Sequence, residues 1–406
     1  MKPLEQTNVL LLIPDLGIGG AERAISRLSV ELAKVCNVYL CRFTDSDTII
    51  YPVGGQLLSL NEPKRKNFFQ KLMSIYFRAT KLKKIKKDFA IHYSISFLEG
   101  ANYINILSRQ GERTIISLRG SILHDKDIRG IQGVIRKRIL IPLLYRQADR
   151  IVALSEGLKH ELYEHFGVSE KKIEVIYNHL DVPELEALSR QEVPVEFKNL
   201  LTLPTLIMSG RLHQQKGHRE FLHVFKEVRL KTPCRLVIFG DGVLREKSIL
   251  CAKSLQLKTY DIWSGEAVTP DYDVYFMGYV KNPFHLIAAS TIFVFPSLYE
   301  GLGNALVEAL ACKITIIATD CHSGPREVLA PGTTSDYRLK TAEYAKYGIL
   351  MPVLDNVAAA GEWISVLEKI INNVSLRETY SFESAKRLYD FDMDLIMPRW
   401  KSIIGY

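Results

Sequence analysis

Short apolar runs alternate along the chain with longer segments in which apolar residues recur every three or four positions. The first run covers residues 9–13 (VLLLI), a helical pattern covers 21–34, and a second run follows at 37–43 (NVYLCRF). A strand, a helix and another strand in this order make a βαβ unit with a parallel sheet. The pattern therefore predicts an α/β protein, with further strands at 91–97, 113–118, 150–154, 173–178, 205–208, 236–239, 274–280, 291–295 and 314–318.

The chain is long enough for two domains, because its 406 residues exceed what a single core usually holds. Residues 181–200 mix proline and charge with weak periodicity, as an interdomain linker does. We therefore predict an N-terminal domain at 1–182, a C-terminal domain at 183–380 and a helical segment at 381–406. Residues 256–272 are predicted to be a surface insertion in the second domain.

A glycine-rich turn, residues 301–304 (GLGN), follows the strand predicted at 291–295 and opens a helix predicted at 305–311. Loops at the carboxyl ends of parallel strands are where open sheets bind ligands, and the free N–H groups of a helix N-terminus suit a phosphate. Glu300 precedes this helix and Glu308 lies within it. Taken alone, such a pair of carboxylates is more typical of a solvated surface.

The string EGLGNALVEALAC, followed by TDCHSGPREVL, resembles the C-terminal signature of the retaining nucleotide-sugar glycosyltransferases of family 4. In that family two glutamates separated by seven residues flank a glycine-rich turn, and an acidic residue follows at a strand end. Glu300, Glu308 and Asp320 occupy these positions. The resemblance covers nearly the whole chain and implies two Rossmann-like domains facing across a cleft, the arrangement called GT-B. It also implies a final helix that crosses back onto the N-terminal domain.

A second part of the signature lies at residues 209–218 (SGRLHQQKGH). Arg211 and Lys216 fit the family pattern of Gly-Arg-Leu, three further residues and Lys-Gly. A guanidinium and an ammonium on either side of a turn can hold both phosphates of a nucleotide diphosphate. Isolated residues of these types are usually surface charges, but this pair follows a buried strand and precedes a helix.

The resemblance also implies roles for these residues. Arg211 and Lys216 would neutralise the leaving diphosphate in place of a metal ion, so no metal and no other cofactor is expected. Glu308 would accept hydrogen bonds from the ribose hydroxyls, and Glu300 would face the sugar and stabilise positive charge at its anomeric carbon. The backbone N–H groups expected to share the diphosphate are those of Gly301, Leu302, Gly303 and Asn304.

The first predicted strand ends in PDLGIGGAER, whose glycines are Gly17, Gly19 and Gly20. A dinucleotide site needs a third glycine where this chain has Glu22, so an NAD-dependent enzyme is disfavoured. In the resembled family this loop lies near the donor phosphates or the acceptor, a role that carries over to Gly19 and Gly20. Arg119 follows a later strand, where family members often carry histidine, and is a candidate phosphate or acceptor contact.

The net charge of +8 is concentrated in one segment. Residues 64–87 contain ten Lys or Arg and no Asp or Glu, so the rest of the chain has a net charge of −2. A basic amphipathic helix of this kind predicts contact with an anionic membrane. The alternatives are a helix packed in the core with solvated lysines, and a nucleic-acid site, for which no motif is present. The predicted apolar arc consists of Phe68, Leu72, Ile75, Ala79 and Leu82.

Other patterns in the sequence predict no further site. No segment resembles a signal peptide, and no uncharged apolar run approaches the roughly 18 residues that a membrane span needs. The six cysteines are scattered without a Cys-x-x-Cys pair, as in a reduced cytosolic protein. The helix predicted around 160–165 lacks the spacing of a zinc motif and is expected to be an exposed face. Asp-x-Asp occurs in four unrelated contexts, which indicates chance, beginning at Asp45, Asp125, Asp271 and Asp392.

These observations predict a retaining glycosyltransferase. It would move a sugar, an N-acetylhexosamine or a hexose, from a nucleotide diphosphate donor (UDP-linked) to a lipid-diphosphate-linked glycan in polysaccharide or glycoconjugate assembly. The basic helix predicts a cytoplasmic protein at the inner face of the plasma membrane, with no nucleic-acid partner. The competing hypothesis is a catalytically silent GT-B-like subunit that binds a nucleotide or a carbohydrate. The presence of both glutamates, the arginine and the lysine disfavours it.

Overall fold

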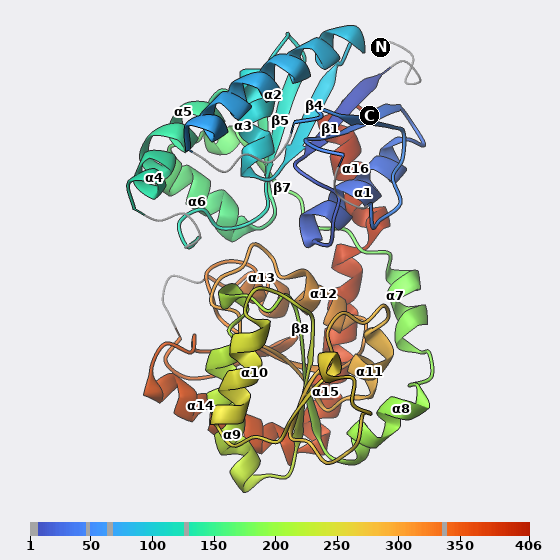
Figure 1. Cartoon of the computed structure of the whole chain (residues 1–406), viewed down its shortest axis with the longest axis vertical. Coiled ribbons are helices and arrows are strands. Elements are labelled where there is room, and N and C mark those ends of the chain that lie inside the picture. The colour runs from blue at the N-terminus through green and yellow to red at the C-terminus, as the bar shows by residue number, and fades with distance from the viewer. Residues whose placement is uncertain (1–6, 46–48, 63–67, 126–129, 335–338) are drawn as a thin grey trace. The chain divides into compact units, whose positions relative to one another are not determined.

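The chain divides into two units (Figure 1). The first unit combines Met1–His179 with Asp394–Tyr406, and the second is Leu180–Met393. The computed structural model describes residues 7–45, 49–62, 68–125, 130–334 and 339–406. For residues 68–72 it describes the backbone but not the side chains.

The first unit is built on a sheet of seven strands in the order β3-β2-β1-β4-β5-β6-β7, and all of its pairings are parallel. The strand order reverses between β1 and β4, so the loops after these two strands lie where such a sheet binds ligands. The strands are β1 (Asn8–Ile13), β2 (Asn37–Arg42), β3 (Gln56–Ser59), β4 (Tyr93–Phe97), β5 (Arg113–Leu118), β6 (Arg150–Ala153) and β7 (Ile173–Val175).

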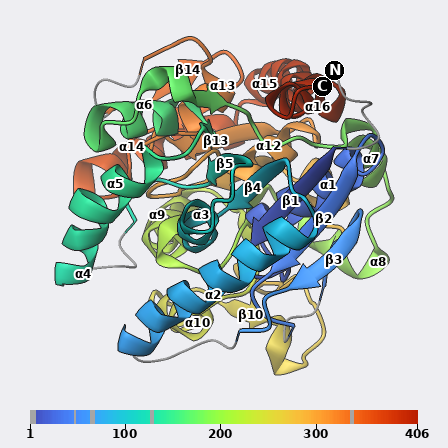
Figure 2. The ribbon, with the colours of Figure 1, turned by 90° about the horizontal axis from the view of Figure 1, so that it is seen from above.

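Two helices, α2 (Phe68–Asp88) and α3 (Glu99–Leu107), lie side by side on one face of this sheet (Figure 2). Leu82 of α2 and Ile104 of α3 share a buried cluster with Leu10 of β1, which fixes both helices to the central strands. The other helical segments before residue 180 are α1 (Gly20–Leu32), α4 (Gly130–Ile135), the π-helical turn η2 (Arg136–Leu140), α5 (Ile141–Tyr145), α6 (Glu156–Phe166) and the 3-10 turn η3 (Glu170–Lys172).

The basic segment is helical from Phe68 onward, but its apolar side is occupied by the protein itself. Ile75 and Leu82 pack into the cluster beneath α2, and Ala79 is buried beside them. These three residues of the predicted arc are therefore part of the core and do not face a membrane. The side chains of Phe68 and Leu72 lie outside the described residues.

Lys86, which the sequence places on the polar side of α2, is buried. Its ammonium lies 2.6 Å from the Glu112 carboxylate and donates to the backbone and side-chain oxygens of Asn105, at 2.9 and 2.8 Å. Burial lowers the pKa of Lys86 to about 8, although Glu112 favours its charged form. This lysine ties α2 to α3 and to the start of β5, so its charge is available neither to a membrane nor to solvent.

The C-terminal helix α16 (Met393–Ile403) belongs to the first unit from Asp394 onward. Trp400 stacks on Phe97 of β4, with their ring centroids 5.8 Å apart. The preceding helix α15 (Val374–Arg387) is part of the second unit, so the returning segment is shorter than the predicted 381–406.

The second unit contains a sheet of eight strands in the order β10-β11-β9-β8-β12-β13-β15-β14. All pairings are parallel except that of β14 with β15. The order reverses at β8, whose neighbours are β9 on one side and β12 on the other. The strands are β8 (Thr205–Ser209), β9 (Arg235–Phe239), β10 (Thr259–Asp261), β11 (Val274–Phe276), β12 (Ile292–Phe295), β13 (Thr315–Thr319), β14 (Glu343–Ala345) and β15 (Gly348–Met351).

Helices pack on this sheet through large buried side chains, among them Phe221 of α9 and Trp363 of α14, whose rings meet edge to face at 5.7 Å. The helical segments are α7 (Val182–Ser189), α8 (Val195–Lys198), η4 (Asn199–Thr202), η5 (Gln214–Lys216), α9 (His218–Lys231), α10 (Arg245–Ser254), η6 (Ile262–Ser264), α11 (Phe284–Ala289), α12 (Asn304–Leu310), α13 (Pro325–Leu329), α14 (Val357–Ile371), α15 and η7 (Leu388–Phe391).

Two expectations for this unit are corrected. The predicted linker at 181–200 is mostly helical, because the Asp181 carboxylate caps α7 by accepting from the Glu184 N–H at 2.9 Å, and Leu185 is buried. The predicted insertion at 256–272 contributes β10, an edge strand that pairs with β11. A three-residue strand is too short to produce a readable pattern.

Candidate active site

The predicted donor-site residues of the second unit lie in the loops that follow β8 and β12, the strands between which the order reverses. Arg211 comes two residues after the end of β8, and Lys216 closes the short turn η5. Glu300 lies five residues beyond the end of β12. The sheet topology therefore brings these three side chains to the ligand-binding edge that the sequence predicted.

Lys216 and Glu300 form an ion pair with 2.6 Å between Nζ and Oε1. Both side chains are shielded, with exposed fractions of 16% and 6%. The ammonium also lies 5.1 Å from the centre of the Phe295 ring. Gln215 adds hydrogen bonds from its side-chain amide to Glu300 Oε2 (3.3 Å) and to the carbonyl of Tyr299 (3.0 Å). The two loops are therefore held together through Glu300.

Gly217 allows this close approach. Its φ of 65° lies in the left-handed region, and a Cβ there would come within 2.0 Å of the Pro296 carbonyl oxygen. The Leu298 N–H donates to the Gln215 carbonyl at 2.7 Å, close to this contact. A larger residue at 217 would push the β12 loop away and separate Lys216 from its partner.

Arg211 is the second cation of the predicted clamp and is exposed. Within the described ranges its guanidinium makes no hydrogen bond or ion pair, while its backbone carbonyl accepts from the His213 N–H at 2.7 Å. The two cations therefore differ in state: Lys216 is held by a carboxylate and Arg211 is available to an anion. This difference could not be predicted from the sequence.

The glycine-rich turn, residues 301–304, directly follows Glu300 in the loop after β12. Ser323 donates from its hydroxyl to the carbonyls of Glu300 (2.7 Å) and Gly301 (3.3 Å), which fixes the start of the turn. In the described part of the chain, the backbone N–H groups of Gly301, Leu302 and Gly303 have no acceptor. The helix α12 then begins at Asn304, one residue earlier than predicted.

The remaining predicted residues of this unit have distinct environments. Leu302 is buried, so only its backbone can take part in binding. Glu308 is half-buried on α12. Asp320 accepts two hydrogen bonds from Arg326, at 3.0 and 2.7 Å, and Arg326 also binds Glu343 at 2.8 Å. Burial raises the pKa of Asp320, and Arg326 opposes that shift. The acidic strand end is therefore engaged in a structural ion pair.

In the first unit, Gly19 and Gly20 follow β1 at the reversal point of that sheet. The Glu22 carboxylate folds back over Gly19, where a Cβ would come within 2.0 Å of Glu22 Oε2. Glu22, the residue that disfavours a dinucleotide site, thus places its carboxylate over the glycine-rich loop that follows β1.

Arg119 lies at the end of β5 and is held within its own unit. Its guanidinium carbon is 4.2 Å from the centre of the Phe97 ring, Nη1 donates to Ser117 at 3.2 Å, and Nη2 donates to Asn178. Burial lowers the pKa of Arg119 to about 9, and Glu22 opposes the shift. A ligand that binds Arg119 would therefore contact the edge of a guanidinium that Phe97, Ser117 and Asn178 already hold in place.

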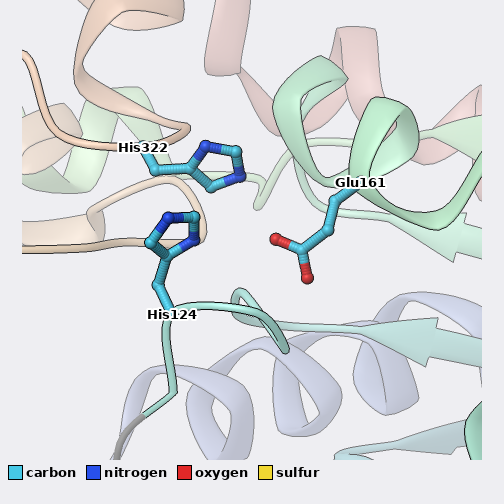
Figure 3. Close-up of side chains that lie close together, drawn as sticks. All are labelled: His124, Glu161 and His322. Carbon is cyan, nitrogen blue, oxygen red and sulfur yellow. The ribbon is translucent and has the colours of Figure 1, made fainter. Parts of the chain in front are cut away.

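Glu161 is a residue whose importance the sequence did not indicate. The prediction of an exposed face at 160–165 was wrong for it, because Glu161 is fully buried while His160 beside it is exposed. Its carboxylate accepts from the N–H groups of Ile122 (2.6 Å) and Leu123 (3.0 Å) and from the Ser121 hydroxyl (2.6 Å). Figure 3 shows this carboxylate directed from α6 toward the loop that carries His124. Glu161 therefore fixes the loop that follows Arg119.

The fold of the chain is that of GT-B glycosyltransferases. A sucrose-phosphate synthase from Thermosynechococcus elongatus superimposes with a TM-score of 0.74 at 14% identity, covering 98% of each chain. The HepE protein of Anabaena in complex with UDP-glucose gives a TM-score of 0.71 at 15% identity, covering 98% of this chain and 100% of its own.

Sequence comparison assigns the family. Residues 18–183 match the model described as Glycosyltransferase Family 4, and residues 203–368 match that of Glycosyl transferases group 1. An uncharacterized glycosyltransferase of Methanocaldococcus jannaschii is 30% identical over 67% of this chain and 68% of its own. The chain therefore belongs to the family 4 (group 1) glycosyltransferases, as its C-terminal signature indicated.

A relative that spans nearly the whole chain has a defined activity in its name. It is the N-acetylgalactosamine-N,N'-diacetylbacillosaminyl-diphospho-undecaprenol 4-alpha-N-acetylgalactosaminyltransferase of Campylobacter jejuni, 28% identical over 94% of this chain and 95% of its own. The amylovoran biosynthesis glycosyltransferase AmsD of Erwinia amylovora is 25% identical over 98% of this chain and 99% of its own. Within the described ranges, no helix of this chain is long and apolar enough to cross a bilayer.

Proposed function

We propose that the protein is a retaining, metal-independent transferase that moves a sugar from a UDP-linked donor to a lipid-diphosphate-linked glycan. The observation that carries the proposal is the grouping of Arg211, Lys216 and Glu300 at the reversal point of the second sheet. Beside this group lie three backbone N–H groups without an acceptor among the described residues. Cations, N–H donors and a carboxylate in one place suit a diphosphate bonded to a sugar.

Arg211 and Lys216 act on the diphosphate in this proposal. Lys216 has three N–H donors, and its bond to Glu300 leaves others for phosphate oxygens. Arg211 brings a planar guanidinium that can bind two oxygens at once. Together they offset the charge that develops on the departing nucleotide, the task that a metal ion performs in other enzymes. No metal and no further cofactor is part of the proposal.

Glu300 and Glu308 have separate roles. Glu300 is fixed by Lys216 and Gln215, so it can hold the sugar and stabilise positive charge at the anomeric carbon. Glu308, half-buried on α12, binds the ribose hydroxyls. In the chemical step, the bond between the anomeric carbon and the diphosphate oxygen breaks while the acceptor oxygen attacks from the same face. The acceptor proton passes to the departing phosphate oxygen, which gives retention without a covalent enzyme intermediate.

The relatives and the surface charge support the proposed acceptor and location. The Campylobacter relative is named for a diphospho-undecaprenol substrate, so a lipid-linked glycan is the proposed acceptor and an N-acetylhexosamine or a hexose the transferred sugar. Lys83, Lys84 and Lys87 are exposed on α2, and these charges attract an anionic bilayer. The protein would then act in the cytoplasm at the inner face of the plasma membrane, without nucleic acid.

A donor screen tests the proposal. UDP-, GDP- and dTDP-sugars are compared for protection against thermal unfolding, and each protecting donor is then assayed for nucleotide release with a polyprenyl-diphosphate glycan. We expect protection and turnover with a UDP-sugar. Arg211→Ala should abolish turnover, whereas Arg219→Ala, which removes an exposed arginine from α9, should not. Protection without turnover would favour the silent binding subunit instead.

A further inference from the structure

A row of aliphatic side chains is exposed along the continuous helical segment formed by α4, η2 and α5. Ile131 is 80% exposed and Leu143 is 61% exposed. Exposed apolar side chains that gather on one element mark a site of contact with a membrane, a protein or a ligand. We call these six residues the apolar stripe: Ile131, Val134, Ile135, Ile139, Leu140 and Leu143.

The helix geometry keeps four residues of the stripe on one side. Ile131, Ile135, Ile139 and Leu143 recur at intervals of four residues. In an α-helix four residues advance about 400°, so such a series rotates around the axis by about 40° at each step. The π-helical turn at Arg136–Leu140 holds more residues per turn and counteracts this rotation. The side chains of Arg136, Ile141, Leu144 and Tyr145 are buried on the opposite side.

The buried side of the segment is anchored by charge. Arg136 Nε lies 2.6 and 2.8 Å from the two carboxylate oxygens of Glu99, and Nη2 lies 3.0 Å from Asp125. Lys137 donates to the Leu123 carbonyl at 2.7 Å. Rotation of the segment to bury the stripe would break this network and expose Tyr145. The stripe is therefore held toward solvent.

The charged side chains of the segment that carries the stripe are all cationic. Residues 130–148 contain no Asp or Glu. Arg138 and Arg146 are exposed, and Lys137 is half-buried. Aliphatic side chains bordered by cations suit a bilayer with anionic headgroups, where the apolar groups enter the acyl boundary and the cations stay at its surface.

We infer that the apolar stripe is a membrane-contact surface that inserts into the headgroup boundary of an anionic bilayer. The choice of a bilayer as the occupant rests on the proposed function, in which the acceptor is anchored in lipid. The composition of the stripe also favours a bilayer over a protein partner. The stripe contains only Ile, Leu and Val, whereas protein interfaces are enriched in Tyr, Trp, Phe, Met and Arg. The stripe also lies on a different element from the basic helix α2, whose residues Ile75, Ala79 and Leu82 are in the core.

The test uses the full chain and sedimentation with vesicles of phosphatidylcholine and phosphatidylglycerol. In the stripe variant, Ile135→Gln, Ile139→Gln and Leu143→Gln are combined, because glutamine keeps the length and the helix propensity while removing the apolar surface. The matched control combines Val195→Gln, Leu230→Gln and Leu250→Gln, three exposed apolar residues of the second unit. We expect the stripe variant to bind vesicles about tenfold more weakly or worse, and the control to bind like the wild type.

A depth measurement gives an independent readout. Ile139→Trp should show fluorescence quenching by lipids brominated on their acyl chains, and Leu250→Trp should not. Equal vesicle binding by the stripe variant and the wild type, or no quenching at position 139, would overturn the inference. So would a wild-type dimer that the stripe substitutions convert to a monomer without loss of vesicle binding, since the occupant would then be a second copy.

The proposed function and this inference can fail separately. If the wild type transfers no sugar from any donor, the enzyme proposal is refuted. If the stripe variant then still binds vesicles more weakly than the wild type, the membrane-contact surface is supported. The stripe variant should retain its activity on a short water-soluble acceptor, because the substitutions leave the donor-site residues unchanged.

Discussion

Lys216 and Glu300 lie 84 positions apart in the sequence, and they meet with 2.6 Å between Nζ and Oε1. Their contact joins the loop after β8 to the loop after β12 at the point where the strand order reverses. It also means that the two residues cannot be varied independently. Removal of the lysine leaves a carboxylate that is only 6% exposed without its charge partner.

The first prediction separates the two cations. Lys216→Ala should lower the free energy of unfolding by about 1–3 kcal/mol, because it leaves a shielded charged group without its strongest partner. Arg211→Ala should change it by less than about 0.5 kcal/mol, because this side chain is exposed. Both should lower turnover by about two orders of magnitude or more. Urea unfolding with steady-state kinetics measures the two effects, and near-normal rates in either variant would remove that residue from the diphosphate clamp.

A double variant refines this test. If the instability of Lys216→Ala comes from the unpaired carboxylate, then Lys216→Met combined with Glu300→Gln should recover most of the lost stability, although not the activity. An unstable double variant would mean that the lysine supports the loop by packing on Phe295 and not through its charge.

The second prediction concerns metals. EDTA should leave turnover largely unchanged, because two cations and backbone N–H groups supply the positive potential. The structure also supports a structural role for the motif at 271–273: the Asp273 carboxylate lies 3.1 Å from Arg229 and accepts from the Lys258 N–H at 2.9 Å. A strict requirement for Mn²⁺ or Mg²⁺ would contradict the proposed mechanism.

The third prediction distinguishes the two glutamates. Glu300→Gln should reduce kcat while the affinity for UDP stays nearly constant, because the carboxylate acts on charge that develops in the transition state. Glu308→Gln should mainly raise KM and weaken UDP binding, because a ribose contact is equally strong in the ground state and the transition state. Isothermal titration with UDP and initial rates would show the two patterns, and exchanged patterns would mean that the roles are reversed.

The fourth prediction concerns pH. Burial lowers the pKa of His179 and of His218 from 6.5 to about 3, and neighbouring cations add to both shifts. Each histidine is neutral when folded and binds a proton more readily when unfolded. Its stabilising effect is therefore complete above pH 6.5 and is lost as the pH falls from 6.5 toward 3. At pH 5.5 each should cost about 1 kcal/mol relative to pH 7.5.

Single substitutions test this dependence. His218→Leu and His179→Leu should each reduce the loss of stability between pH 7.5 and 5.5, as measured by urea unfolding. The exposed His160 provides the control, since His160→Gln should leave the pH dependence unchanged. An unchanged slope in both leucine variants would show that other groups control acid stability.

Much of the fold could be predicted because its signals are local. The buried strands β1 and β12 are nearly continuous apolar runs, and glycines with fixed spacing follow both. The predictions that were wrong concern features that depend on tertiary contacts. The sequence of α2 shows a basic amphipathic helix, but only the packing of Leu82 against Leu10 shows which side is internal.

The candidate site shows the same division. Arg211, Lys216 and Glu300 could be located because the strings around them resemble the signature of a known family, although their spacing alone would have favoured surface charges. The pairing of Lys216 with Glu300 could not, since it depends on how two distant loops meet. Glu161 gave no signal at all, because a buried glutamate that binds backbone N–H groups looks like any other helix glutamate in a sequence.

The last prediction concerns the basic helix α2 and uses its exposed lysines. Lys81 is excluded, because its ammonium lies 2.8 Å from Glu62 and donates to the Leu60 carbonyl at 2.9 Å, so its reversal would disturb the fold. Lys83, Lys84 and Lys87 are exposed. Each charge near an anionic bilayer contributes about 1 kcal/mol, so reversing all three to Glu should abolish most binding to anionic vesicles at low salt.

The salt dependence shows which force is lost. Binding of the wild type should weaken as salt rises from low concentration to 0.15 M, where charges are screened over about 8 Å. Activity on a short water-soluble acceptor should persist in the charge-reversed variant, because the donor-site residues belong to the other unit. Lys226, Lys247 and Lys253 of the second unit, reversed to Glu, give a control of equal charge. If this control loses vesicle binding as much as the α2 variant does, then net charge and not α2 governs attraction to the membrane.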